Sequence, residues 1–338
     1  MFIIHKVKDK FSFVAARLDT QWDAFVDRSP DGTIFSESVY LAAVRHEADC
    51  WYVVKGDQVK AGVLMLKARD GSGFELDDDV IYGGLMFAPV DEKWKQNRSQ
   101  ILSIRYQITE FTVAELTARA KKVQIALAPG IDDIRPFLWH CYHDPDPAHH
   151  FYHDLRYTSV LRIDSILQTA ELETPEFQAL GSSRKQEIRY ARKDNVKAEM
   201  TDNVDGFLEI SSLAAGAQGH DFADRRRAMK PIIENLLAKR RGILFGVFDS
   251  GRRMISGAYF CFDGKRAYYL YGANHPELRD RYSGTIVLWD AFLHLRRMGY
   301  REIDLEGVNS PKRGWFKMSF GGELRTYHQL TLNGDAVC

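Results

Sequence analysis

The pattern of apolar and polar residues divides the first half of the chain into short strand segments and longer helical segments. Residues 92–120 carry a helical pattern, and a break is expected near Thr109, whose hydroxyl suits the N-cap of a second helix. The other elements expected in this half are a helix at 36–48 and strands at 51–54, 63–66, 123–127 and around Ile81–Tyr82.

Helical and strand patterns continue to alternate in the second half of the chain. Ser183 and Gln186 form a capping-box pattern before a helix at 184–193. A later helix is expected to hold Pro231 in its first turn. The remaining elements expected here are a helix at 285–298 and strands at 243–248, 258–262, 266–274, 302–306 and 325–332.

The expected strand at 266–274 contains three tyrosines in the sequence RAYYLYGAN. If the side chains alternate, Tyr269 and Tyr271 share one face of the sheet and Tyr268 lies on the other with Leu270. The pattern therefore predicts that Tyr269 and Tyr271 lie side by side on the sheet.

Two glycine hairpins indicate an internal duplication. Gly56 and Gly62 enclose five residues, and Gly251 and Gly257 enclose five residues in the same way, each pair lying between apolar strands. The first glycine suits a turn with positive φ, and the second allows a neighbouring element to approach closely. Because a length of 338 residues already favours two domains, the match supports a duplicated fold.

The composition is that of a soluble globular protein, with 45% hydrophobic and 27% charged residues. Basic and acidic residues are equal at 46 each, so no global field attracts nucleic acid and any RNA contact depends on local patches. No apolar run reaches the length of a membrane span, and the first residues lack the apolar core of a secretory signal. The four cysteines are far apart, without metal-ligand spacing, so we expect reduced thiols and a cytoplasmic protein.

The stretch 303–322, IDLEGVNSPKRGWFKMSFGG, concentrates the candidate chemistry. A short buried strand carries Asp304 and Glu306 on its alternate face, and a polar loop rich in glycine is expected to follow it. Lys317 comes two residues after Trp315, and a lysine among apolar residues is a desolvated charge that suits an oxyanion or a phosphate. The alternative is a solvated Lys317 beside aromatic residues that pack as ordinary core.

Clusters of basic residues mark candidate anion sites. The helix at 184–193 carries five arginines and lysines, and two interpretations remain open for it. It is either a solvated helix face or a surface for the phosphates of tRNA or of a nucleotide-linked acceptor. Arg225, Arg226 and Arg227 precede another helix and also suit an anion, although a solvated loop would have the same sequence.

Five histidines fall between residues 140 and 153, which raises the question of a metal site. His149 and His150 are adjacent, so their side chains diverge, and no carboxylate stands at helical ligand spacing. Packed or hydrogen-bonded histidines are therefore favoured, and we predict no metal.

The order of these features resembles the end of the Fem-type (FemABX-like) aminoacyltransferases. These enzymes form a branch of the GNAT superfamily in which one chain holds two acetyltransferase-like folds. The resemblance is densest from Ser182 to Gly322 and also includes an Arg135-Pro136-Phe137-x-Trp139 stretch. It rests on a strand ending in Glu306-Gly307, a glycine-bearing loop, Phe316-Lys317, Phe320-Gly321-Gly322, and a basic helix with Lys185, Ile188, Arg189, Ala191 and Lys193.

The resemblance implies an α/β fold with a mixed sheet, made of two tandem GNAT-like (acyl-CoA N-acyltransferase) domains at residues 1–165 and 166–338. It implies an amide-forming enzyme that moves an amino acid from aminoacyl-tRNA to the amine of a peptidoglycan precursor, a peptide or a small metabolite. Aminoacyl-tRNA would be the co-substrate, with no cofactor. The expected partners are aminoacyl-tRNA and a small peptide or nucleotide-linked acceptor.

A coenzyme A site belongs to the main alternative. In a standard acetyltransferase the turn before the helix at 285–298 reads Arg/Gln-x-x-Gly-x-Gly/Ala, and its amides hold the pyrophosphate of coenzyme A. Arg281 and Gly284 are present, but Ile286 replaces the second small residue and would crowd the phosphate. The alternative is a GNAT-type N-acyltransferase that uses acyl-CoA or an acyl carrier in polysaccharide or metabolite synthesis. A binding module without chemistry is the third possibility.

Each candidate residue receives an expected role from its type and from the resemblance. Lys317 is expected to stabilise the carbonyl oxygen or the leaving ribose hydroxyl, and Tyr271 and Tyr282 are expected to assist proton transfer. The residues expected to bind substrate are Arg135, Trp139, Arg184, Arg189, Arg192, Arg225, Arg227, Asn274, Arg281, Ser283, Gly284, Asp304, Glu306 and Phe316.

Overall fold

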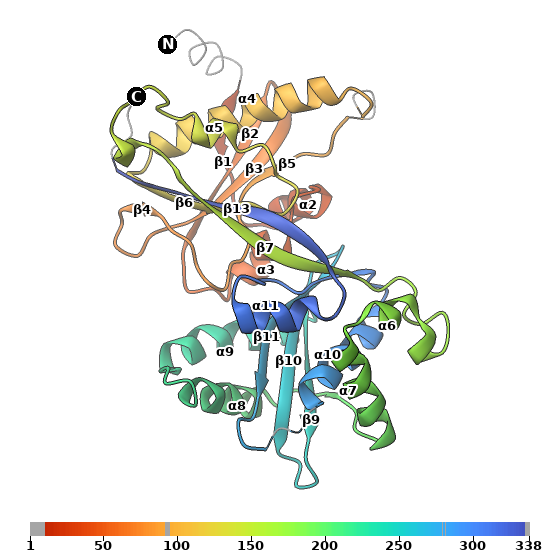
Figure 1. Ribbon diagram of the computed structural model, residues 1–338. Coiled ribbons are helices and arrows are strands. Elements are labelled where there is room, and N and C mark those ends of the chain that lie inside the picture. The colour runs from red at the N-terminus through yellow and green to blue at the C-terminus, as the bar shows by residue number, and fades with distance from the viewer. Residues whose placement is uncertain (1–10, 92–94, 279, 281, 335–338) are drawn as a thin grey trace. The chain divides into compact units, whose positions relative to one another are not determined.

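A computed structural model describes residues 11–91, 95–278, 280 and 282–334 (Figure 1). The chain forms two compact units. Unit 1 comprises Met1–Arg156 and Thr326–Cys338, and unit 2 comprises Tyr157–Arg325. The chain leaves unit 1 within β7 (Tyr152–Arg162) and returns to it within β13 (Glu323–Asn333).

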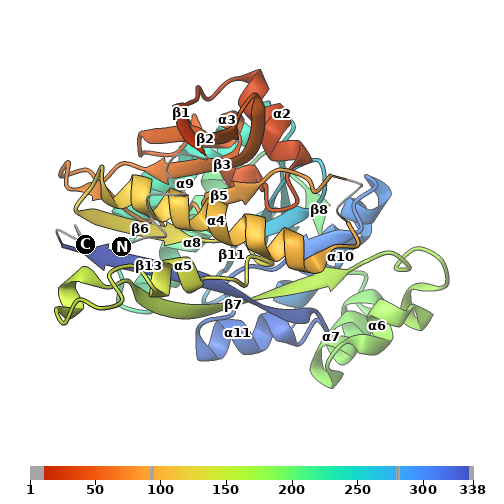
Figure 2. The same ribbon diagram turned by 90° about the horizontal axis from the view of Figure 1, so that it is seen from above.

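Unit 1 contains an antiparallel sheet and the ends of the two shared strands. The antiparallel sheet has the order β1-β2-β3-β5, formed by Ser12–Ala15, Ala48–Lys55, Gln58–Leu66 and Gly84–Phe87. Beside it, β4 (Gly73–Phe74) pairs with β6 (Lys122–Ala126), which pairs with β13. The helix α4 (Arg98–Thr117) packs against β3, β5 and β6 (Figure 2). The shorter helices of this unit are α2 (Thr20–Arg28), α3 (Ser38–Leu41) and α5 (Arg135–Leu138).

Unit 2 is a mixed sheet with helices on both faces. From β7 the strand order is β12 (Glu302–Asp304), β11 (Ala267–Asn274), β10 (Met254–Phe262), β9 (Gly242–Phe248) and β8 (Glu199–Met200). Only β11 and β12 in this order run parallel to each other. One face carries α7 (Ser182–Lys193) and α10 (Ser283–Arg297), and the other carries α8 (Val204–Gly216) and α9 (Ala223–Ala238) (Figure 1). Two short helices, α6 (Pro175–Ala179) and α11 (Pro311–Met318), complete the unit.

The two glycine hairpins have the same function in the two units. An added Cβ on Gly62 would lie 2.5 Å from the ring of Phe25 on α2, and one on Gly257 would lie 2.5 Å from the ring of Phe207 on α8. Each glycine therefore allows a helix to place a phenylalanine directly on the central strand. Gly56 has the expected positive φ of 57°, whereas Arg252 takes that conformation in the second hairpin.

Two expectations for the helices of unit 1 are wrong. The helix expected at 36–48 is reduced to α3, because the chain turns after Leu41 and His46 is anchored by the carbonyl of Lys67. The expected break near Thr109 is absent, since its hydroxyl donates to the carbonyl of Arg105 within α4. The strand expected around Ile81–Tyr82 also begins later, at β5.

Two expectations for the helices of unit 2 are wrong as well. The N-cap of α7 is Gly181, without a side-chain cap, so Ser183 and Gln186 do not form a capping box. Gln186 instead donates to the Tyr190 hydroxyl one turn later. Pro231 lies inside α9 rather than in its first turn, because this helix begins eight residues earlier.

A β-bulge in β11 separates the tyrosines that were expected on one face. Tyr259 of β10 pairs with Tyr271, whereas the next residue, Phe260, pairs with Tyr269, so Leu270 is the extra residue. Partners across an antiparallel pair share a face, and consecutive residues alternate. Tyr269 and Tyr271 therefore lie on opposite faces, and the expectation of a shared face is wrong.

Two further expectations from the sequence concern the cysteines and the absence of a membrane span. Cys50 and Cys261 are free and buried, but Cys141 is disulfide-bonded, which departs from the expectation of reduced thiols throughout. Within the described residues, none of the helices is both long enough and apolar enough to cross a membrane.

An ion-pair network joins α7 to α10 and to the segment before α6. The Arg192 guanidinium donates to both carboxylate oxygens of Glu171 at 3.0 Å and also to Asp290. Trp289 Nε1 donates to Glu171 at 2.7 Å. Burial alone would raise the pKa of Glu171, but its bonds with Arg192 outweigh that effect and hold the pKa below its usual range.

Replacing Arg192 by methionine is expected to lower the free energy of unfolding by about 1–3 kcal/mol, because two partly buried acids lose their cation. The contribution of Glu171 is present above its ordinary pKa and is lost as the pH falls through its lowered pKa in the folded state. The difference between wild type and variant should therefore shrink below about pH 4. Denaturant unfolding at several pH values measures it. As a control, Arg227→Met removes an exposed pair with Asp224 and should change stability by about 0.5 kcal/mol or less.

Candidate active site

The site in unit 2 begins where β12 ends. Asp304 is fully buried, accepts a hydrogen bond from the Thr158 hydroxyl, and accepts another from the Glu306 N–H at 2.8 Å. Glu306 has a positive φ of 54°, which is uncommon for a residue with a side chain. The carboxylate of Asp304 thus fixes a sharp turn in the backbone at Glu306.

The loop after this turn is held on β7, and it is shorter than expected. Asn309 accepts from the Tyr157 N–H at 2.7 Å and donates to the Tyr157 carbonyl at 3.0 Å. The segment expected to stay a loop as far as Gly314 is already helical from Pro311, which takes the first position of α11. Gly314 is buried in that helix, and an added Cβ would lie 2.4 Å from the carbonyl oxygen of Val308. α11 can approach the loop this closely only without a side chain at that position.

Lys317 points from α11 back to the turn at Glu306. Its Nζ donates to the Glu306 carbonyl at 3.3 Å and lies 5.2 Å from the centre of the Tyr269 ring. Burial lowers the pKa of Lys317, although the carboxylates of Glu306 and Asp304 oppose this effect. Lys317 is thus partly buried, which favours the interpretation of a desolvated lysine over that of a solvated one.

The two aromatic residues before Lys317 behave differently. Phe316 packs against Phe320, and the Arg184 guanidinium lies 4.9 Å from the centre of its ring. Trp315, which either interpretation would have placed in apolar surroundings, is 80% exposed. α11 therefore buries Phe316 and presents Trp315 to solvent.

Arg184 is part of a local network rather than an exposed basic face. Its guanidinium donates to the Thr285 hydroxyl at 2.8 Å and to Glu187 at 2.9 Å, and the same hydroxyl donates to Glu187. Burial lowers the pKa of Arg184, and Glu187 opposes this shift. Together with its contact to Phe316, this network connects α7 and α10 to the helix that carries Lys317.

The other tyrosines named from the sequence lie in different surroundings. Tyr271 stacks on Tyr259 with ring centres 5.9 Å apart, and the Arg225 guanidinium lies 5.3 Å from the centre of its ring. The Tyr282 hydroxyl donates to Asp194 at 3.0 Å. Tyr269 rather than Tyr271 is the tyrosine that contacts Lys317, because of the bulge in β11.

The N-terminus of α10 is capped by an acid of the same chain. Asp280 Oδ1 accepts from the N–H groups of Tyr282 at 2.8 Å and Ser283 at 2.6 Å. The Thr285 N–H already donates to the Tyr282 carbonyl. A carboxylate therefore occupies amides that a phosphate would need at this helix end.

Gly284 and Ile286 have structural roles here. An added Cβ on Gly284 would lie 2.9 Å from the Asn274 side-chain oxygen, which also accepts from the Ser256 hydroxyl. Ile286 is fully buried in the hydrophobic core, so its side chain does not crowd the helix end as expected. Asp280, rather than Ile286, contacts the amides at the helix end.

The remaining candidates are spread over both units, and their substrate roles stay predictions. Arg192 is in the ion-pair network above, Arg189 lies 5.4 Å from the centre of the Phe177 ring, and Arg227 pairs with Asp224. In unit 1, Arg135 pairs with Asp133 and lies 5.4 Å from the ring centre of the half-exposed Trp139. Arg281 lies outside the described residues.

Three site residues were not found from the sequence. Tyr269 was placed with Tyr271 by strict alternation, and the bulge has no clear sequence signal. Thr158 supports Asp304 from a strand 146 positions away, which only the tertiary fold brings near. Asp280 had a detectable signal, because an acid two or three residues before a helix start suits a cap.

Metal binding finds no support in the described part of the chain, where no group of three or more potential ligands can hold an ion. His149 contacts the Asp144 carboxylate at 2.8 Å, and His150 contacts the Asp144 carbonyl at 2.9 Å. His153 and His328 of unit 1 contact each other at 2.8 Å. These histidines are hydrogen-bonded, as the sequence favoured.

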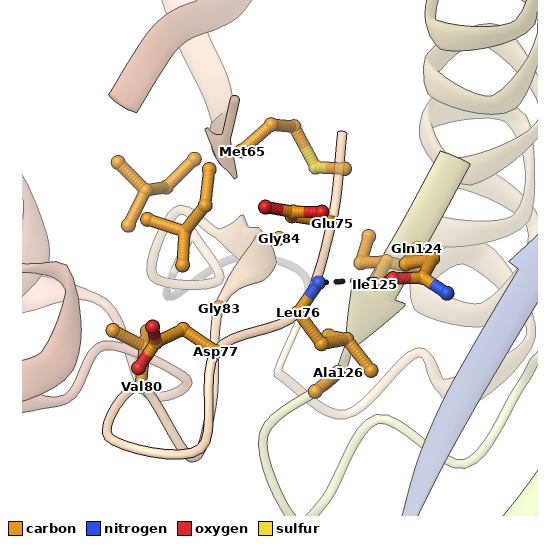
Figure 3. A pocket seen from close by; sticks show the side chains of 12 residues that line it. Met65, Glu75, Leu76, Asp77, Val80, Gly83, Gly84, Gln124, Ile125 and Ala126 are labelled. Carbon is orange, nitrogen blue, oxygen red and sulfur yellow. Dashed lines mark hydrogen bonds between the residues drawn. The ribbon is translucent and has the colours of Figure 1, made fainter. Parts of the chain in front are cut away.

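A small hollow in unit 1 offers no comparable chemistry (Figure 3). It lies between β3, β5 and β6 and is partly open to solvent, with mainly apolar walls and two acids, Glu75 and Asp77. Glu75 pairs with Lys122 at 3.0 Å, and Asp77 contacts His46 at 3.0 Å. Because both carboxylates already have these partners, we assign no catalytic role to the hollow.

Comparisons with known proteins agree with this fold. Residues 182–313 match the acetyltransferase (GNAT) domain family. The structure of FemX matches with a TM-score of 0.63 and 16% identity, over 96% of this chain and 98% of that chain. A conserved protein of unknown function from Bacteroides thetaiotaomicron VPI-5482 matches with a TM-score of 0.57 and 10% identity, over 95% and 99% of the two chains. A tandem GNAT protein from the clavulanic acid biosynthesis pathway, solved without AcCoA, matches with 0.52 and 12%, over 96% and 99%. No curated protein matches the chain.

These matches confirm the predicted fold, a mixed α/β structure of two tandem GNAT-like domains that is similar to FemX. The match to an acetyltransferase family also confirms the predicted class of enzyme, an acyltransferase. The identities to the solved structures are low, so these likenesses concern the fold. The boundary between domains at residues 165 and 166 stays a prediction.

Gly314→Ala tests how tightly α11 is fixed. The added Cβ would clash with the backbone carbonyl of Val308, so α11 must move and the free energy of unfolding should fall by about 1–3 kcal/mol. Gly307→Ala is the matched control, because its Cβ would have only the Asn309 side chain within 4 Å, at 3.9 Å. Equal denaturation midpoints for the two variants would contradict the close packing of α11.

Proposed function

We propose that the protein is an aminoacyltransferase that moves an amino acid from aminoacyl-tRNA to an acceptor amine. The observation that carries this proposal is the partly buried Lys317, whose ammonium group is held by the Glu306 carbonyl beside the Tyr269 ring. The resemblance to Fem-type enzymes around Phe316-Lys317 and the similarity to the FemX fold support it. An uncharged acceptor amine would attack the ester directly, so the reaction needs no nucleophilic side chain.

The reaction exchanges one bond for another. The amine nitrogen bonds to the ester carbonyl carbon, and the bond between that carbon and the ribose oxygen then breaks. Lys317 stabilises the negative charge on the carbonyl oxygen between these steps. The nitrogen loses a proton and the ribose oxygen gains one. Glu306 offers a carboxylate close enough to raise the pKa of Lys317, and we assign it as the acceptor of the amine proton.

In this proposal the acceptor is a negatively charged molecule. An exposed arginine, Arg189, is available to phosphates of a nucleotide-linked acceptor such as a peptidoglycan precursor, whereas Arg226 and Arg227 pair with Asp205 and Asp224. Arg184 and Arg192 are better explained as supports of α11 and α7, because both donate to acids of the same unit. In this proposal the enzyme needs no cofactor.

Lys317→Met should lower kcat for transfer by about 10²–10³ and leave the KM for both substrates within a few-fold. Methionine keeps most of the stem volume, so stability should change by about 1 kcal/mol or less. In the wild type the rate should fall as the pH rises through the lowered pKa of Lys317, and the variant should lack this fall in rate. Single-turnover transfer from a defined aminoacyl-tRNA measures these changes.

The control for this variant is Lys239→Met, which removes an exposed lysine at the end of α9. It should retain wild-type kcat. Retention of most activity by Lys317→Met would show that the catalytic charge lies elsewhere. Unfolding of that variant would instead make Lys317 structural, and Lys317→Arg, which keeps a charge, would then fold without catalysing.

An N-acyltransferase that uses acyl-CoA is the second candidate, because the matched family is one of acetyltransferases. Asp280 argues against it, since its carboxylate caps the amides of Tyr282 and Ser283 and would repel a pyrophosphate there. We expect no saturable binding of coenzyme A by calorimetry. Clear one-site binding would favour this candidate over aminoacyl transfer.

A further inference from the structure

Trp315 is a feature of the site that the proposed reaction does not use. Its side chain is 80% exposed, the highest value among the exposed large hydrophobic side chains of the described residues. Gly314 and Phe316 on either side face the protein, so α11 is anchored firmly while it presents the indole to solvent. A single exposed apolar side chain needs no partner by itself, so its surroundings decide the question.

Two exposed cations lie on α11. Lys312 is one turn before Trp315 and therefore shares its side of the helix. Arg313 is one turn before Lys317 and therefore lies on the side of the helix that carries Lys317. Neither cation forms an ion pair with an acid in the described part of the chain. The exposed surface of α11 thus combines the indole and Lys312 on one side with Arg313 toward Lys317.

We propose that the exposed surface of α11, with Trp315 and Lys312 on one side and Arg313 toward Lys317, is a stacking platform for the single-stranded end of an RNA donor. A base would stack on the Trp315 indole, and the two cations would contact the neighbouring phosphates. Stacking on an aromatic ring tolerates any base, and the negatively charged phosphates complement the two cations of α11. The inference rests on the proposed function, because the ester to be cleaved is at the end of such a strand.

The position of Trp315 sets the direction of approach. Trp315 and Lys317 are two residues apart, about 3 Å along the helix axis and about 200° around it. The indole therefore points away from Lys317, and a strand stacked on it must turn over the edge of α11 to bring its ester to the ammonium group. A membrane surface is less well matched, since this face has one ring rather than several apolar side chains.

The test uses the full chain and two RNA probes. One is a fluorescently labelled hairpin with a four-nucleotide single-stranded 3′ end, and the other is the same hairpin with a blunt end. Trp315→Ala should weaken binding of the first probe roughly tenfold or more, measured by fluorescence anisotropy. Trp315→Phe, which keeps an aromatic face, should restore most of the affinity. Neither variant should change binding of the blunt hairpin.

The charges are tested by salt dependence. Replacing Lys312 and Arg313 together by glutamine should reduce the slope of log affinity against log salt by roughly 1.4, or about 0.7 for each lost phosphate contact. Arg252→Gln is the matched control, because Arg252 is an exposed arginine in the turn between β9 and β10, at the opposite end of unit 2 from α11 (Figure 1). That variant should keep the wild-type slope.

Three outcomes would overturn the platform. The first is wild-type affinity of Trp315→Ala for the single-stranded probe, and the second is an equal loss of affinity for both hairpins. The third is a wild type that does not bind RNA but binds anionic phospholipid vesicles through Trp315. The proposed function is judged separately by aminoacyl transfer. Normal transfer by Trp315→Ala with an unchanged KM for tRNA would reject the platform alone, whereas no transfer by the wild type would reject the proposed function.

Discussion

The partial burial of the Lys317 ammonium group is the constraint on which the candidate site depends. Removing a charge from water is unfavourable, and the lowered pKa of Lys317 reflects that cost. The Glu306 carbonyl, the face of the Tyr269 ring and the nearby carboxylates compensate for part of it. A cation that has already lost part of its water shell needs less reorganisation when an oxyanion forms beside it, which is why this position suits catalysis.

Keeping the charge in place requires that α11 be held rigidly, and contacts with several parts of unit 2 hold it. Gly314 allows α11 to pack on the loop backbone, and Phe316 lies beneath the Arg184 guanidinium. The Gly181 N–H donates to the Ser319 carbonyl at 2.9 Å, which ties the start of α7 to the end of α11. A short helix would be marginal by itself, so these tertiary contacts determine its position.

The sequence was sufficient where local chemistry decides the structure, and it failed where distant residues do. Apolar periodicity located most strands, and the glycine spacing at Gly62 and Gly257 predicted close helix contacts that the structure contains. The bulge at Leu270 could not be predicted, because it depends on the register with β10. Arg184 was ambiguous for a similar reason, since its acid and hydroxyl partners include Thr285, 101 positions away.

The two units differ in charge where β6 and β12 end. Unit 1 reads Ile125-Ala126-Leu127-Ala128 at the end of β6, while unit 2 reads Ile303-Asp304-Leu305-Glu306 at the end of β12. The apolar positions are buried in both units, and the two alternate positions hold alanine in unit 1 and acids in unit 2. Buried acids need partners, and in unit 2 Thr158 and the turn at Glu306 supply some of them. Those acids in turn favour the charged form of Lys317, so the partly buried lysine and the two carboxylates stabilise each other, whereas unit 1 has neither acid at these positions.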